Sequence, residues 1–315
     1  MQDNAQNYHS HNNHNDYNNY EDKINLKLLL SIAFNLLITI SEIIGGLLSN
    51  SLSLISDAVH NLSDTASIVL TYISRKISVR PKTYKHTFGF KRVEILSALI
   101  NAAALWGISI FLLIHSYHRF IEPKIINSKI MFIIAMIGLL NNLISVLLLH
   151  NHSSENLNIK SAYLHLLADT FSSIGVIAGA ILMYFYKIYW IDAIITALIV
   201  LYILKESWDI IKQTLHILLQ GAPDNIDLLK IEKALLKIKD IENIHHTHIW
   251  SLSDNEIFFE THINIKDMMV SKTSELTGQI QKILFSEFGI THITIQYEVS
   301  GCQGDTIINS SCKNK

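Results

Sequence analysis

The sequence predicts an α-helical membrane protein, in which a bundle of six transmembrane helices precedes a small α+β domain of order αββαβ. The first observation is composition: 49% of the 315 residues are hydrophobic and only 17% are charged, which is rare in soluble domains. The second is a series of apolar segments of roughly 17–26 residues, the length that crosses about 30 Å of hydrocarbon. We place these six segments near residues 24–48, 52–74, 94–117, 129–150, 161–186 and 189–205.

Composition divides the chain into four parts. Residues 1–22 are rich in Asn and His and offer almost nothing to bury, so we expect a disordered N-terminal tail. Residues 23–221 form the predicted transmembrane domain, because the sixth helix continues beyond its apolar segment to a Gly and Pro stop signal. Residues 222–300 form the predicted soluble domain, and residues 301–315 a flexible tail.

The soluble domain shows alternating helical and strand patterns. The helix "IDLLKIEKALLKIK" has Asp224 or Asn225 as its expected N-cap, and a second helix begins near Ser271 and ends at Gly289. The three strands are expected at 243–253, 256–265 and 291–299. A core of about 75 residues is marginal alone, so we expect a homodimer.

Lys and Arg in the loops predict the orientation. The loop between the second and third segments, "SRKISVRPKTYKHTFGFKR", carries seven of them, whereas the loop before the second segment carries none. Both termini are therefore expected in the cytoplasm. Residues 1–22 lack the apolar core of a signal peptide, so we expect none. The short chain and loops favour a multi-pass protein of a bacterial inner membrane.

The sequence indicates neither nucleic acid nor ATP as a partner, and its cysteines bear on the compartment. The net charge of −2 offers no basic field for nucleic acid, and no nucleotide-binding loop indicates ATP. The two cysteines, Cys302 and Cys312, lie in the C-terminal tail and are no disulfide framework, which favours a reducing compartment. A cysteine pair ten residues apart could hold metal, but solvated thiols are the simpler interpretation.

Two polar pairs lie inside apolar segments, His60 with Asp64 in the second and His165 with Asp169 in the fifth. Each pair is spaced i, i+4 and therefore shares one helix face. If these helices are neighbours, two imidazoles and two carboxylates meet near the middle of the membrane. Such a set suits tetrahedral Zn²⁺ better than Mg²⁺ or Ca²⁺, and two carboxylates neutralise one divalent cation.

Metal and protons would compete for these four side chains, because ligands must be deprotonated to bind metal. Empty carboxylates inside a membrane are costly as anions and tend to take up protons. This competition is the physical basis of a metal/proton antiporter. The alternative interpretation is that each pair only holds helices together by hydrogen bonds.

Other polar residues lie in or near the apolar segments. Asp57, one turn before the histidine of the second segment, has either a supporting role or a role in admitting metal, or only an interfacial position. Glu42 and Asp192 are expected to be solvated or to cap helices, and Asn141 and Asn142 to form hydrogen bonds between helices.

A family resemblance rests on five stretches: "SNSLSLISDAVHNLSD", "HTFGFKRVEILSALIN", "SAYLHLLADTFSSIGV", "HIW" and "FGITHITIQYE". Together they resemble the cation diffusion facilitator family, the zinc transporters of the cobalt–zinc–cadmium resistance type. The resemblance implies a homodimer, a ferredoxin-like cytosolic domain, and export of Zn²⁺ in exchange for H⁺, with Cd²⁺ and Co²⁺ as further candidates. The family's transport-site positions fall on His60, Asp64, His165 and Asp169.

The resemblance also implies a cytosolic zinc site. His245, His262 and Glu298 match positions that bind zinc in several relatives, and His248 and His292 are further candidates. Of these, His292 stands one place away from the position at which many relatives carry histidine. The alternative is a group of ordinary surface histidines on a small sheet.

His86 falls on a position that some members use for another site in the loop between the second and third segments. The second histidine of that site is replaced here by Phe90, so we expect the site to be absent or weak.

Two other classes of protein compete with a transporter as interpretations of these residues. A membrane metalloenzyme would need a zinc with an open ligand position and a general base, but the chain has no HExxH motif and no nucleophile elbow, so no enzyme activity is expected. A metal sensor that binds zinc in the cytosolic domain without transport remains the alternative, although it leaves the intramembrane pairs unexplained.

Overall fold

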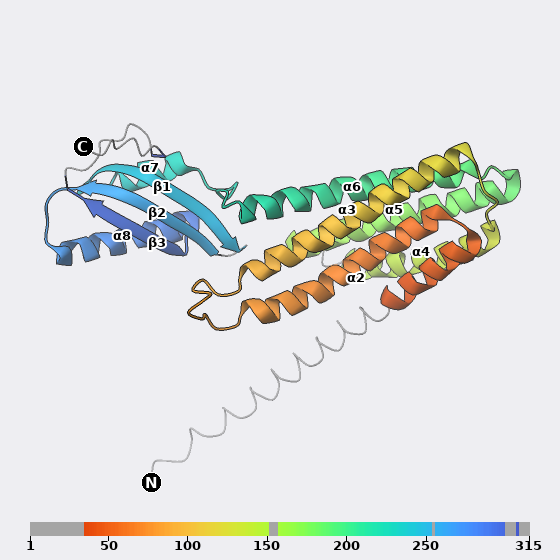
Figure 1. Ribbon diagram of the computed structural model, residues 1–315, viewed down its shortest axis with the longest axis horizontal. Coiled ribbons are helices and arrows are strands. Elements are labelled where there is room, and N and C mark those ends of the chain that lie inside the picture. Colours follow the sequence, from red (N-terminus) through yellow and green to blue (C-terminus); the bar gives the residue numbers. More distant parts are fainter. Residues whose placement is uncertain (1–34, 151–156, 254–255, 300–306, 309–315) are drawn as a thin grey trace, which may run out of the picture. The chain divides into compact units, whose positions relative to one another are not determined.

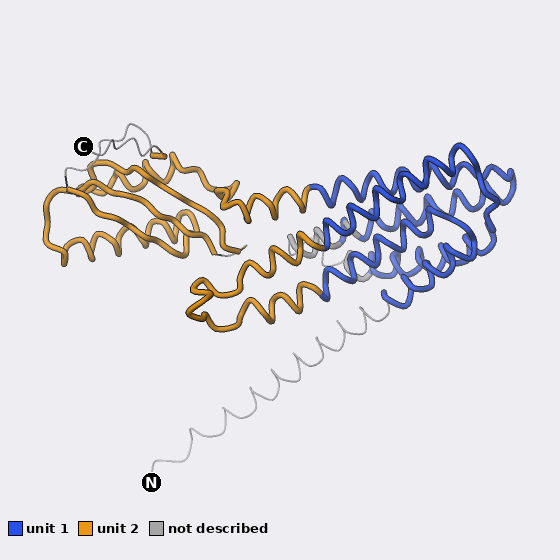
Figure 2. Tube along the Cα trace, in the orientation of Figure 1, with its two compact units in different colours: residues 1–69, 101–208 blue, residues 70–100, 209–315 orange. Residues whose placement is uncertain are grey.

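The computed structural model describes residues 35–150, 157–253, 256–299 and 307–308 (Figure 1). The tails 1–22 and 301–315 fall outside these residues except for Ile307 and Ile308, and so do Cys302 and Cys312. Contacts divide the chain into two compact units (Figure 2). Unit 1 comprises Met1–Val69 and Asn101–Trp208, and unit 2 comprises Leu70–Ile100 and Asp209–Lys315.

Each predicted apolar segment is helical over its described residues. The helices are Asn35–Ser49, α2 (Leu52–Ser78), α3 (Arg92–Ile121), α4 (Ser128–His150), α5 (Leu157–Tyr186) and α6 (Trp190–Leu218). Judged by length and composition, three stretches in the described residues are long and apolar enough to cross a membrane: Arg92–Ile121, Ser128–Leu147 and Leu166–Tyr186. The first helix is shorter within the described residues, and α2 contains several ionisable side chains, so six crossings remain a prediction.

The helices of unit 1 turn large apolar side chains outward and several polar side chains inward. Phe111, Phe171 and Leu198 are exposed, whereas Glu42 and Asp192 are buried. A water-soluble bundle has the opposite arrangement. This distribution suits a hydrocarbon surround, because lipid solvates the apolar exterior while the interior satisfies its polar groups.

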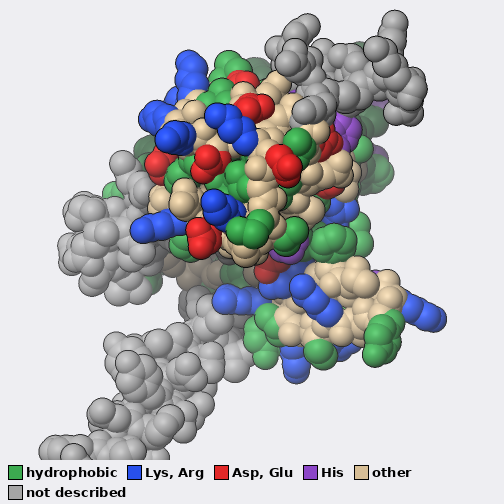
Figure 3. Space-filling model, turned by 90° about the vertical axis from the view of Figure 1, so that its left-hand side faces the viewer, with side chains coloured by type: hydrophobic (Ala, Val, Ile, Leu, Met, Phe, Trp, Pro, Cys, Tyr) green, Lys and Arg blue, Asp and Glu red, His purple; other side chains and the backbone are tan. Residues whose placement is uncertain are grey.

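The described C-terminal part of unit 2 has the predicted order αββαβ: α7 (Leu228–Leu235), β1 (Ile241–Ser253), β2 (Glu256–Ile265), α8 (Val270–Phe288) and β3 (His292–Glu298). The sheet order is β1-β2-β3, with β1 and β2 antiparallel and β2 and β3 parallel. Helix α8 makes the crossover that a parallel pair requires. Charged side chains of both signs intermix on the face of unit 2 shown in Figure 3, as expected of a surface in water.

The starts of the two soluble helices differ from the sequence prediction. The N-cap of α7 is Asp227, whose carboxylate accepts a hydrogen bond from Leu229 N at 2.9 Å, so the assignment of Asp224 or Asn225 was wrong. A turn precedes the helix at those residues. Helix α8 starts after Met269, without a side-chain cap. Its predicted end is confirmed, because Gly289 adopts a left-handed φ of 69°.

Candidate metal centres

The first cluster lies in unit 1 and joins α2 to α5. His60 Nε2 is 3.2 Å from Asp169 Oδ1 and 3.8 Å from Asp64 Oδ2. One ligand atom from each of the three residues lies within 4.8 Å of the others. His60 and Asp169 are each 5% exposed, while Asp64 is partly open. The two helices are therefore neighbours, as the sequence argument required, and an imidazole and two carboxylates converge.

His165 is the fourth residue that the sequence assigns to this cluster. It lies on α5, one turn before Asp169, but its side chain falls outside the part of the chain that the structure describes. The helical backbone keeps the i, i+4 relation to Asp169. Its membership of the cluster remains a prediction.

A cavity of about 460 Å³ adjoins the cluster. Its polar lining includes His60, Asp169, Ser172 and Tyr202, and its remaining wall is apolar, from α5 and α6. The ring of Tyr202 lies edge-on to that of His60, with centroids 6.4 Å apart. An ion at the cluster would thus adjoin a space large enough for water or a partly hydrated cation.

Asp57 is buried and does not belong to the cluster of possible ligands. Its carboxylate accepts hydrogen bonds from Ser172 Oγ at 2.8 Å and from Ser173 Oγ at 3.5 Å. Asn142 of α4 in turn donates to Ser173 Oγ at 3.4 Å, which confirms a hydrogen bond between helices at that residue. Asp57 therefore holds α2 against α5 one turn from His60, in keeping with the supporting role.

Asp192 is a helix cap, but of a different helix. Its carboxylate accepts four hydrogen bonds at the start of α2: from Ser51 Oγ, Leu52 N, Ser53 N and Ser53 Oγ. Glu42 is neither solvated nor a cap, so that expectation was wrong. It is 1% exposed and accepts a hydrogen bond from Asn61 Nδ2 at 2.9 Å. The residues that donate hydrogen bonds to Asp192 and to Glu42 lie far from these acids in the sequence, and no local pattern shows them.

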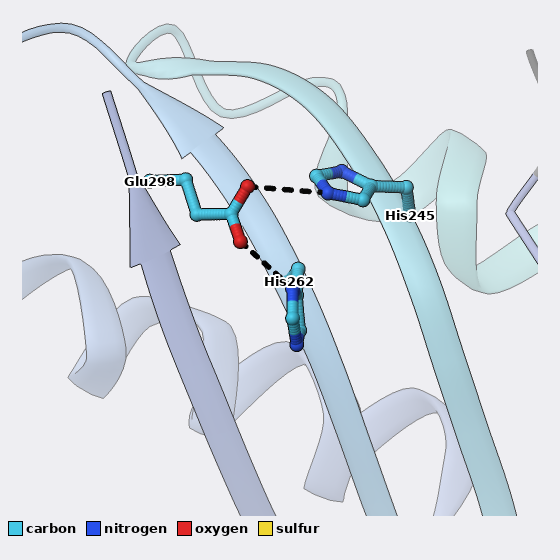
Figure 4. Close-up of side chains that lie close together, drawn as sticks. All are labelled: His245, His262 and Glu298. Carbon is cyan, nitrogen blue, oxygen red and sulfur yellow. Dashed lines mark hydrogen bonds and ion pairs between the residues drawn. The ribbon is translucent and has the colours of Figure 1, made fainter. Parts of the chain in front are cut away.

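The second cluster lies in unit 2, where one side chain comes from each strand (Figure 4). Glu298 of β3 bridges the two histidines: Oε1 lies 2.8 Å from His262 Nδ1 and Oε2 lies 3.3 Å from His245 Nε2. His245 is 1% exposed, and neither of its ring nitrogens has a hydrogen bond within the described residues. Apart from the contact of its Nε2 with Glu298, this buried imidazole has no polar partner within the described residues, and a metal ion would supply the partner that buried polar groups normally have.

An irregularity in β1 places His245. The pairing of β1 with β2 shifts register between His245 and His248, and His246 between them has a φ of +49°. Such a bulge re-aims side chains and bends the strand. It leaves His245 buried directly opposite His262, while His246 contacts both His248 and His262 through its ring.

Three other histidines named from the sequence lie apart from both clusters. His248 is exposed and packs against His246, and His292 is exposed and lies against the ring of Phe258, with centroids 4.4 Å apart. His86 is exposed, and its ring packs on Phe90 with centroids 4.6 Å apart. The structure thus gathers no metal-ligating group around these three within the described residues.

Comparison with known proteins gives the family. The description "Cation efflux transmembrane domain" matches residues 28–219, and "Cation efflux protein, cytoplasmic domain" matches residues 223–300. The chain is 39% identical to the metal cation efflux system protein CzcD of Cupriavidus metallidurans, over 89% of this chain and 87% of that protein.

Two further relatives have similar coverage. The cadmium, cobalt and zinc/H(+)-K(+) antiporter of Bacillus subtilis is 36% identical, over 85% of this chain and 87% of its own. The zinc transporter ZitB of Escherichia coli is 35% identical, over 84% of each chain. The matches to a cation efflux transmembrane domain and to a cation efflux cytoplasmic domain define a membrane transporter of metal cations. The chain belongs to the cation diffusion facilitator family of cation efflux proteins.

Proposed function

We propose that this protein exports Zn²⁺ from the cytoplasm in exchange for protons, through a site formed by His60, Asp64, His165 and Asp169. The observation that carries the proposal is the convergence of His60, Asp64 and Asp169 between α2 and α5. Two carboxylates balance the charge of one divalent cation, and nitrogen with oxygen donors suits zinc. The relatives named as zinc, cadmium and cobalt transporters support metal as the cargo and leave Cd²⁺ and Co²⁺ as further substrates.

Exchange follows from competition for the same atoms. Zinc binds the deprotonated side chains, and protons replace it when zinc leaves. A site that is anionic when empty is costly inside a membrane, so proton uptake completes the cycle and the proton gradient supplies the energy. Alternating access would rock helices around the fixed site. The name of the Bacillus subtilis relative, an antiporter that uses H⁺, supports the coupling.

We also propose the oligomeric state, the membrane and the orientation of the transporter. The protein acts as a homodimer of six-span protomers in a bacterial inner membrane, with both termini in the cytoplasm. The loop rich in Lys and Arg between α2 and α3 supports the orientation. The small core of the soluble domain supports dimerisation, as does the match to the family's cytoplasmic domain.

We assign a regulatory zinc ion to His245, His262 and Glu298. Two imidazole nitrogens and a carboxylate fit zinc, and buried His245 lacks a hydrogen bond within the described residues. A metal ion held there would tie all three strands together. Zinc bound in the cytosolic domain would then stabilise it when cytoplasmic zinc is high.

The test is zinc uptake into inside-out vesicles under an imposed pH gradient. Wild type should take up zinc only with the gradient, and Asp169→Ala should lose uptake. Asp209→Ala, an exposed residue of α6, is the matched control and should behave as wild type. Uptake by Asp169→Ala equal to wild type would refute the proposed site, and uptake without a gradient would refute proton coupling.

A metal sensor without transport is the second candidate, which the cluster of His245, His262 and Glu298 favours. A sensor would lose its response through changes to that cluster and would be unaffected by Asp169→Ala. The same vesicle experiment separates the two functions, because a sensor moves no zinc in any variant.

A further inference from the structure

We propose that Glu42 is a proton-carrying residue of the transport cycle, separate from the metal ligands, which holds a proton when the intramembrane site is empty and releases it when zinc binds. This inference rests on the proposed exchange of zinc for protons. It assigns one of the exchanged protons to a carboxyl group that does not touch the metal.

The first argument is the environment of Glu42. Its side chain lies in the interior of unit 1, on helix Asn35–Ser49, and is 1% exposed. Among the described residues, its only hydrogen bond comes from Asn61 Nδ2 at 2.9 Å, and it makes no ion pair. A carboxylate anion needs a cation or several donors to offset the loss of water. With one neutral donor, the protonated acid is the form that this environment accommodates.

The second argument is that two glycines leave space for this carboxyl group between neighbouring helices. A Cβ added at Gly138 of α4 would meet Glu42 Oε1 well inside contact distance. A Cβ added at Gly45, one turn beyond Glu42, would collide with Ile134 of α4. The two glycines therefore let helix Asn35–Ser49 approach α4 closely and leave space for the acid group.

The third argument is the charge around Glu42. The titratable groups that face it are Asp57 on α2 and Asp169 on α5, and α4 presents Gly138. Within the described residues, the ionisable groups that act on Glu42 are therefore other carboxyl groups. A divalent cation at His60, Asp64 and Asp169 neutralises the negative charge of the two aspartates. The acid then loses its proton without contacting the metal, which couples zinc binding to proton release.

Asn61 connects the protonation of Glu42 to the contact between two helices. It stands next to His60 on α2, and its amide donates to the Glu42 carboxyl. A carboxylate accepts this hydrogen bond more strongly than a neutral acid does. Deprotonation of Glu42 would therefore tighten the contact between helix Asn35–Ser49 and α2 at the level of the metal ligands.

The experiment counts protons released per zinc ion bound by the full-length protein in detergent, with a pH indicator in weak buffer. Wild type is compared with Glu42→Gln, which has the shape of the protonated acid. Glu287→Gln, at an exposed position of α8, is the matched control. We expect Glu42→Gln to bind zinc and to release about one proton fewer than wild type and the control. Equal proton release in all three proteins would overturn the proposal.

Infrared spectroscopy provides an independent reading of the same proton. The metal-free protein should show the carbonyl band of a buried carboxylic acid that shrinks when zinc is added and is missing in Glu42→Gln. If Glu42→Gln fails to fold, Gly138→Ala keeps the acid but displaces it, and should shift that band, whereas Gly107→Ala, where an added Cβ meets nothing within 4 Å, should not. A band unchanged by zinc and by these substitutions would overturn the proposal.

The two proposals fail in different ways. If wild-type vesicles take up zinc without a pH gradient, proton-coupled transport is wrong whatever Glu42 does. If uptake needs the gradient but proton release is the same in Glu42→Gln and wild type, the exchange stands and the assignment to Glu42 is wrong.

Discussion

Replacing Glu298 by Gln should remove zinc stabilisation of the cytosolic domain while leaving the metal-free fold intact. Gln has the shape of Glu and can still accept from one histidine, but it loses the charge that faces both His262 Nδ1 at 2.8 Å and His245 Nε2 at 3.3 Å. Loss of a residue that merely supports a metal site costs about 10- to 100-fold in affinity. Loss of a ligand should reach at least the upper end of that range.

The expected magnitude follows from linkage. At a zinc concentration about 100 times the dissociation constant, binding stabilises the folded domain by about 2.7 kcal/mol. If Glu298→Gln weakens binding about 100-fold, the same zinc concentration contributes only about 0.4 kcal/mol. The opening equilibrium of the sheet should therefore fall about 100-fold on adding zinc to wild type and only about twofold in the variant.

Hydrogen exchange of the β1 and β2 amides in the full-length protein measures this effect directly. Glu260→Gln is the matched control, because Glu260 lies exposed on β2 and opposite His248, outside the cluster. It should keep the full zinc effect. A Glu298→Gln protein that zinc protects as strongly as wild type would refute the assignment of this carboxylate as a ligand.

Two further predictions concern stability. Asp192→Ala should destabilise the bundle by about 2 kcal/mol or more, because it removes a buried cap of α2 and its four hydrogen bonds; thermal unfolding in detergent equal to that of Asp209→Ala would contradict this. The pKa of His246 is lowered from 6.5 by burial and by neighbouring His262 and His248, so the folded domain disfavours the charged ring. The metal-free domain should therefore lose stability as pH falls below about 6.5, and His246→Gln should flatten that loss in hydrogen exchange; an unchanged slope would show that His246 does not cause it.

The parts of the fold that the sequence predicts are those set by local periodicity. The apolar segments and the αββαβ order follow from spacing along the chain, and the structure has helices and strands at those places. The i, i+4 spacing likewise places His60 and Asp64 on one face of α2. The neighbouring position of Asp169 followed only from the assumption that two similar helices meet, which the 3.2 Å approach to His60 confirms.

Residues whose environment depends on distant partners were not predicted. Asp192 caps a helix that begins about 140 residues earlier in the chain, and Glu42 is buried because α2 and α4 pack around it. A local pattern shows only that an acid lies near the end of an apolar segment. Similarly, strand alternation does not reveal the bulge at His246 that buries His245 opposite His262.

The different charge of the two clusters argues for different tasks. The cluster of unit 1 brings two carboxylates to one imidazole, so a divalent cation bound there would leave the site nearly neutral. This charge balance suits the proposed exchange of zinc for protons, because the exchange would change the charge of the site little. The cluster of unit 2 has one carboxylate, with Glu298 and His262 about one-fifth exposed. Water can compensate its charge, so zinc can bind there without obligatory proton exchange, as a regulatory ion requires.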